Sequence, residues 1–154
     1  MEHSKIFLFL CIFVLAAASC GKDKDAVRPE IVDSGKASPV NCQCYRKGTV
    51  IPFRYTFMDN LELGNFNIEI HNNFDHHTHS TEAGDCPLDA KKAPVKPWVY
   101  NQDFSIPAGK TAYEAELDIP VPSDVDPGDY HFMIRLTDKA GWQQLKSISL
   151  KVTE

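Results

Sequence analysis

The most constraining feature of this sequence is an alternation of apolar and polar residues that recurs from residue 28 to the C-terminal end. Alternation with a period of two places every second side chain on one face of an extended chain, as in a half-buried β-strand. No stretch repeats apolar residues at the spacing of an amphipathic helix. We therefore predict an all-β fold with strands over 28–33, 49–58, 65–71, 98–106, 113–121, 130–136 and 142–152.

Turn-forming residues such as Gly, Pro and Asp separate these segments. Seven short strands divided in this way predict an immunoglobulin-like seven-stranded β-sandwich. Two local patterns favour the same fold. The segment 127–130 resembles the tyrosine corner of immunoglobulin-like domains, and 138–142 resembles their final hairpin. Residues 28–154 are one domain's worth of chain, long enough to bury a core.

The N-terminal segment has the pattern of an export signal. Residues 1–19 carry a lysine, an apolar stretch too short to span a membrane, and small residues before a cysteine. The run 17–20, Ala-Ala-Ser-Cys, resembles the lipobox of bacterial lipoproteins. This resemblance implies cleavage before Cys20, a lipid on its sulfur, and an anchored protein in the bacterial cell envelope, with the outer membrane expected. Residues 20–27 are then a charged tether. The alternative is ordinary signal cleavage beside an incidental cysteine.

Charge indicates which partners to exclude. The formal net charge is −5, and lysines are interspersed with acidic residues. Neither a basic patch nor a basic amphipathic helix is present in the sequence, so we expect no nucleic-acid partner and no second membrane contact.

Three cysteines remain after the signal and the lipidation site: Cys42, Cys44 and Cys86. In an oxidising compartment, one disulfide and one free thiol are expected. Cys42 and Cys44 are too close in sequence for an easy bond with each other, so Cys86 should pair with one of them. We favour Cys44 with Cys86 and leave Cys42 as the alternative partner. A Cys-x-Cys metal site is the other interpretation.

One long segment, 72–96, lacks apolar periodicity and contains several histidines. Long loops inside compact domains are uncommon and are usually functional or disordered. Strand parity connects the start of this loop to a distant strand. In a sandwich, the strands at 65–71 and 130–136 are antiparallel neighbours, and their apolar residues face the core. His71 and His131 should then lie on the outer face at one pole. If they are directly opposed, their Cβ atoms should be about 5 Å apart.

Imidazole nitrogens in such a cluster are common ligands for Zn, Cu, Fe or Ni. The candidate metal ligands are His71, His76, His77, His79 and His131, with Asp75 as a carboxylate ligand or as a partner that fixes an imidazole tautomer. The expected ion is Zn or Cu. A solvated histidine loop without metal is the competing interpretation. No nucleophile elbow, phosphate loop or HExxH pattern occurs, so we predict that the protein is not an enzyme.

The whole mature chain resembles a family of uncharacterised lipoproteins from Bacteroidota with a single immunoglobulin-like domain. The most specific part of the resemblance is the run 70–79, Ile-His-Asn-Asn-Phe-Asp-His-His-Thr-His. The segment 128–142 fits it as well. The resemblance implies the fold and the envelope location, but it implies no activity.

The leading hypothesis is a lipid-anchored binding module of the cell envelope that captures a transition metal at one pole of the sandwich. An envelope protein or an outer-membrane transporter is a candidate recipient of the metal. The alternative is a protein- or glycan-interaction module that uses the 72–96 loop and the outer sheet face without metal.

Overall fold

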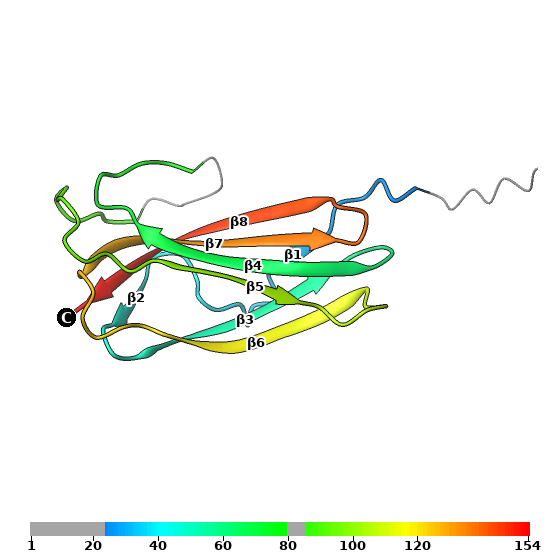
Figure 1. Ribbon diagram of the computed structural model, residues 1–154, viewed down its shortest axis with the longest axis horizontal. Coiled ribbons are helices and arrows are strands. Elements are labelled where there is room, and N and C mark those ends of the chain that lie inside the picture. Colours follow the sequence, from blue (N-terminus) through cyan, green and yellow to red (C-terminus); the bar gives the residue numbers. More distant parts are fainter. Residues whose placement is uncertain (1–23, 80–85) are drawn as a thin grey trace, which may run out of the picture.

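The computed structural model describes residues 24–79 and 86–154, which form a β-sandwich of two packed sheets (Figure 1). The predicted signal peptide and Cys20 lie outside these residues. In the described part of the chain, no helix is long and apolar enough to cross a membrane.

The strands divide unequally between the two sheets. The smaller sheet has the order β1-β3-β6, and the larger has the order β2-β8-β7-β4-β5. Neighbours are antiparallel except β2 and β8, which are parallel. The bounds are β1 Glu30–Val32, β2 Gln43–Arg46, β3 Val50–Met58, β4 Leu63–Asn72, β5 Tyr100–Ser105, β6 Ala112–Pro120, β7 Gly128–Asp138 and β8 Gln143–Thr153.

The prediction of an all-β sandwich is confirmed, but the predicted number of seven strands is wrong. Residues 24–79 and 86–154 form eight strands, and β2 is the strand that the alternation did not predict. This strand has only four residues, of which Tyr45 alone is buried, so it shows no alternation to detect. It is held instead by its parallel pairing with the final strand, from Gln43 beside Leu150 to Arg46 beside Thr153. A pairing partner so distant in sequence leaves no local signal.

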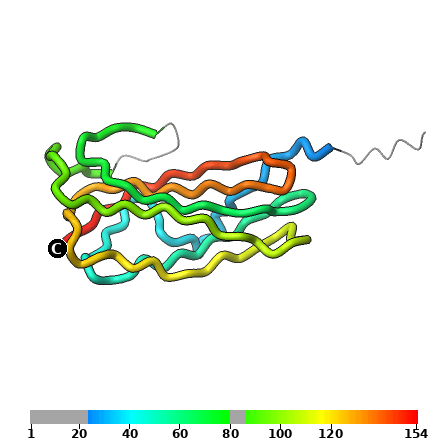
Figure 2. The backbone as a smooth tube through the Cα atoms, in the orientation of Figure 1, coloured from blue at the N-terminus to red at the C-terminus, as the bar shows by residue number. Residues whose placement is uncertain are grey.

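The core lies between the two sheets and is built from the alternating residues that the sequence places inward. Phe53 of the smaller sheet packs against Phe66 and Phe132 of the larger sheet, with ring centroids 5.8 and 6.0 Å apart. All three side chains are buried. Aromatic side chains that bury this much apolar surface stabilise a sandwich strongly. The tube in Figure 2 follows the same two layers along the long axis of the domain.

The predicted tyrosine corner is present at the start of β7. The Tyr130 hydroxyl donates a hydrogen bond to the carbonyl of Asp126 at 2.7 Å and accepts one from the amide of Trp98 at 3.2 Å. Tyr130 is almost fully buried. This contact fixes the register in which the chain enters β7, and β7 carries one of the candidate site residues.

Candidate metal centre

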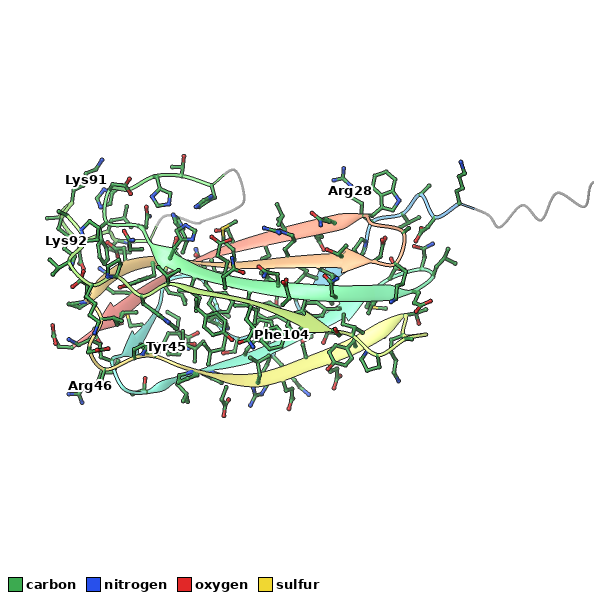
Figure 3. All side chains as sticks on the ribbon, in the orientation of Figure 1. Arg28, Tyr45, Arg46, Lys91, Lys92 and Phe104 are labelled. Carbon is green, nitrogen blue, oxygen red and sulfur yellow. A yellow bond between two sulfur atoms is a disulfide. The ribbon has the colours of Figure 1, made fainter. Side chains whose placement is uncertain are left out.

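The loop that follows β4 is fastened to the sandwich by its backbone and one buried ring. The amide of Asn73 donates a hydrogen bond to the carbonyl of Asp129 at 2.8 Å. The amide of Lys92 donates one to the carbonyl of Phe74 at 3.1 Å. Phe74 is buried edge-on against Tyr130, with centroids 5.3 Å apart. The Lys92 ammonium lies 4.4 Å from the centre of the Phe74 ring on its face, at the pole where Figure 3 labels Lys92. The histidines therefore stand on an anchored segment.

Gly128 makes room for this anchor. Its φ of +132° lies in a region that favours glycine, and an added Cβ would lie 2.9 Å from the Phe74 ring. The Pro-Gly-Asp-Tyr segment at 127–130 thus serves two purposes: it allows Phe74 to pack closely, and it begins the strand that carries His131.

His71 and His131 are direct partners in the β4–β7 ladder, as strand parity predicted. Their ring centroids are 5.4 Å apart. His131 is buried, with 2% of its surface exposed, and His71 is partly buried. The loop folds back over this pair. It places His77 with its ring centroid 5.0 Å from that of His131, and His79 at 4.6 Å.

Three of these rings direct the same nitrogen at one another. The Nε2 atom of His71 lies 3.0 Å from Nε2 of His79 and 3.3 Å from Nε2 of His77. These distances fit ligands that share an ion, because two nitrogens bound tetrahedrally at 2.0–2.1 Å are about 3.3 Å apart. The triad of His71, His77 and His79 is therefore geometrically able to hold a metal ion.

A carboxylate lies beside the Nδ1 atom of two of the rings. The Nδ1 atom of His77 lies 2.6 Å from Oδ1 of Asp75, and because a carboxylate can only accept, the proton is on Nδ1, which donates the hydrogen bond. His77 Nε2 then carries a lone pair. Nδ1 of His71 lies 3.1 Å from Oε1 of Glu69, off the ideal hydrogen-bond direction. This arrangement favours a lone pair on His71 Nε2 as well. Two lone pairs that face each other repel unless a cation lies between them.

Burial keeps the inner rings neutral. Desolvation lowers the pKa of His71, although the nearby Glu69 opposes the shift. Desolvation also lowers the pKa of His131 to about 4. The hydrogen bond from His77 lowers the pKa of the Asp75 carboxyl. Neutral imidazole is the form that binds metals, so the lowered pKa of His71 favours its metal-binding form at neutral pH.

His131 lines the centre without joining the triad. Its Nε2 donates a hydrogen bond to the carbonyl of His77 at 3.1 Å, which orients the loop. Its Nδ1 is buried and has no hydrogen-bond partner among residues 24–79 and 86–154. Buried acceptors of this kind are costly when they stay unpaired. His131 supports the site by position and offers a further nitrogen donor.

The remaining candidates take other roles. His76 faces away from the triad, with its Nε2 2.9 Å from the carbonyl oxygen of Asp89. Its φ of +60° reverses the chain after Asp75. Asp75 is the tautomer-fixing partner and not a member of the triad. Glu69 is not among the site residues predicted from the sequence. Its outward position two residues before His71 on the same strand was the available signal, because such residues lie side by side on one face.

The disulfide joins Cys42 to Cys86, so the favoured pairing of Cys44 with Cys86 is wrong. Cys44 is free and exposed. It lies on β2, where it is fixed beside Lys151 of β8. Cys42 precedes that strand in a left-handed conformation with φ of +64°. The sequence could not distinguish the two cysteines because the unrecognised strand holds one and leaves the other in the turn.

Fold and site together define the class of protein: an all-β sandwich whose larger sheet carries, at one pole, a histidine triad able to hold a metal ion. The chain belongs to the family described as "Domain of unknown function (DUF4625)", whose model matches residues 17–153. The predicted membership of an uncharacterised family is thereby confirmed, and its lipoprotein character stays a prediction. No curated protein matches the chain.

Among solved structures, the chain is similar to Spo0M, a sporulation control protein from Bacillus subtilis. The two share 10% sequence identity with a TM-score of 0.41, and the match covers 82% of this chain and 49% of that one. This chain therefore spans about half the length of Spo0M.

Proposed function

We propose that this protein is a lipid-anchored binding module of the bacterial cell envelope that captures a transition-metal ion, Zn²⁺ or Cu²⁺. The observation that carries the proposal is the convergence of three Nε2 atoms, two of them 3.0 and 3.3 Å from His71 Nε2. Three nitrogen ligands leave a coordination position open to water or to a group from a partner. An open position suits a module that receives an ion and passes it on.

Capture, and not catalysis, is the activity that the surrounding carboxylates support. In a hydrolytic metal site, a free carboxylate or histidine takes a proton from the bound water. Here Asp75 is engaged by His77, and Glu69 lies against His71. Both carboxylates orient ligands, which is a role in metal binding.

The lipid anchor rests on the Ala-Ala-Ser-Cys run that ends at Cys20. Several acyl chains give stable attachment, since each buried CH₂ contributes about 0.8 kcal/mol. An outer-membrane transporter or another envelope protein is the recipient that this location offers. Mass spectrometry of the protein purified from membranes tests the anchor: a Cys20 N-terminus with added acyl mass supports it, and an unmodified cysteine contradicts it.

The metal itself is tested on protein purified without an affinity histidine tag. We expect close to one equivalent of Zn²⁺ or Cu²⁺ by elemental analysis, and saturable heat when either ion is titrated into stripped protein. Less than about 0.2 equivalents of any transition metal, with no heat on titration, would exclude the proposal. Reduced thiols are blocked beforehand, so that Cys44 does not contribute a site.

A second candidate function is protein or glycan binding by the long loop without metal. The observation in its favour is apolar exposure at the end of that loop and just beyond it: Val95 is 89% exposed, and Val99, three residues after the loop, is 69% exposed. Exposed apolar side chains that gather on one surface mark interaction sites. A double variant, Val95→Ser with Val99→Ser, separates the two functions, because metal binding should remain unchanged.

A further inference from the structure

A second group of ligand-type side chains lies at the pole of the sandwich opposite the histidines. Asp25 precedes β1, Asp59 follows β3, and Asp138 ends β7. One carboxylate oxygen from each lies within 4.8 Å of the other two. Figure 1 shows this pole, where the N-terminal segment, the β3–β4 turn and the β7–β8 hairpin meet, at the far end from the histidine loop.

Two of these carboxylates have buried oxygens that accept no hydrogen bond from any described residue. Asp138 is only 4% exposed, and although its Oδ1 accepts a hydrogen bond from the Trp142 amide at 2.8 Å, its Oδ2 has no partner. The Oδ2 atom of Asp59 accepts hydrogen bonds from the amides of Leu61 and Glu62. Its Oδ1 is buried and has no partner among the described residues. A buried carboxylate oxygen without a donor is costly, so a cationic partner is the expected remedy.

The described part of the chain supplies no such partner. No lysine, arginine or histidine nitrogen in residues 24–79 and 86–154 forms an ion pair with Asp25, Asp59 or Asp138. The nearby Arg28 lies instead over the Trp142 ring, with its guanidinium carbon 6.0 Å from the ring centre. Figure 3 labels Arg28 at this pole. Three carboxylates of like charge repel one another at this distance.

We propose that Asp25, Asp59 and Asp138 form a Ca²⁺ site. Calcium takes six to eight oxygen ligands at 2.3–2.6 Å in a flexible arrangement, so oxygens bound to one ion lie up to about 5 Å apart. The three carboxylate oxygens lie within 4.8 Å of one another, which satisfies this condition. The all-oxygen set disfavours the nitrogen-seeking metals of the histidine pole, and Mg²⁺ demands a stricter octahedron.

Calcium at this site links the N-terminal segment to the body of the domain. The carbonyl of Asp25 already accepts a hydrogen bond from Nε1 of Trp142 at 2.9 Å, and the ion adds a bond through its carboxylate. Four residues separate Asp25 from Cys20, a reach of at most about 18 Å. A consequence for orientation rests on the proposed function. When Cys20 carries a lipid, bound calcium holds this pole near the membrane, so the histidine pole points away from it.

The test uses the full-chain protein, purified in detergent and stripped with EGTA. Titration of CaCl₂ is followed by thermal unfolding and by tryptophan fluorescence. Trp142, one of the two tryptophans, is 40% exposed and donates a hydrogen bond to Asp25. We expect the melting temperature to rise and saturate with Ca²⁺, because an ion that binds only the folded state stabilises it. Asp25→Asn should raise the Kd at least tenfold.

Asp33→Asn is the matched control. The Oδ1 atom of Asp33 accepts a hydrogen bond from the amide of Gly35, just as Oδ1 of Asp25 accepts one from the amide of Val27. Asp33 lies outside the carboxylate cluster. The Kd of this variant for Ca²⁺ should stay within twofold of that of the parent protein. Without calcium, Asp25→Asn should melt no lower than the parent protein, because it relieves repulsion. Equal calcium responses of the two variants would overturn the site, and an equal Kd for Mg²⁺ would overturn its assignment to calcium.

His79→Asn tests whether calcium binds at the histidine pole instead, because this substitution removes one imidazole ligand of the histidine triad. Its Ca²⁺ affinity should be unchanged. A loss of calcium binding in this variant would mean that the ion binds at the histidines, contrary to the proposal. Neither measurement depends on the lipid, so failure of the anchor and failure of the calcium site are separable.

Discussion

His71 on β4 and His131 on β7 are directly paired across an antiparallel ladder, with ring centroids 5.4 Å apart, although two further strands separate them along the chain. This pair forms the floor of the candidate metal centre. The loop after β4 then places His77 and His79 above it. Because the floor is fixed by sheet hydrogen bonds, only the loop has to move when an ion enters or leaves.

The ligand assignment predicts a sharp contrast between two histidines of the same loop. His79→Asn removes one Nε2 donor from the triad and should weaken Zn²⁺ binding by more than about 100-fold, above the 10- to 100-fold typical of ligand-orienting residues. His76→Asn should change the affinity less than threefold, since His76 faces Asp89. Asparagine tolerates the left-handed backbone at this position. Isothermal titration measures both, and equal losses would contradict the triad.

The orienting carboxylates make a separate prediction. Glu69→Gln and Asp75→Asn leave all three ligands in place, but an amide no longer selects the tautomer with a lone pair on Nε2. Each should weaken Zn²⁺ binding by about 10- to 100-fold, without lowering the melting temperature of the metal-free protein by more than a few degrees. Glu116→Gln, an exposed glutamate on the other sheet, is the control. Unchanged affinity in both orienting variants would mean that the tautomers are not set by these contacts.

Period-two patterning was sufficient to predict the strands that carry the site. It placed Ile70 inward and His71 outward, and the same parity on β7 brought His131 to the same face. Loop residues obey no such parity, so the patterning could not choose among His76, His77 and His79. That choice depends on the left-handed turn at His76 and on the burial of Phe74, which are tertiary effects.

The disulfide shows the same limit. Cys42 and Cys44 are nearly equivalent in the sequence, and only the parallel pairing of β2 with β8 decides which one faces Cys86. Cys42→Ser opens a loop of 44 residues and should cost about 4 kcal/mol of unfolding free energy in the chain-entropy model. Cys44→Ser should change it by less than about 0.5 kcal/mol, because Cys44 is exposed and free. Denaturant unfolding under non-reducing conditions measures both, and a larger loss for Cys44→Ser would refute the pairing.

The buried His131 makes the metal-free protein sensitive to acid. Its pKa is about 4 in the folded state, against about 6.5 when unfolded, because burial disfavours the imidazolium. The unfolded chain therefore binds more protons between these values, so stability is full above about pH 6.5 and falls as the pH drops toward 4. The loss is on the order of 3 kcal/mol, and the lowered pKa of His71 adds to it in the same direction. Urea unfolding in EDTA across this range measures the slope. His131→Gln cannot titrate and should flatten it, whereas an unchanged slope would show that the acid sensitivity comes from other groups.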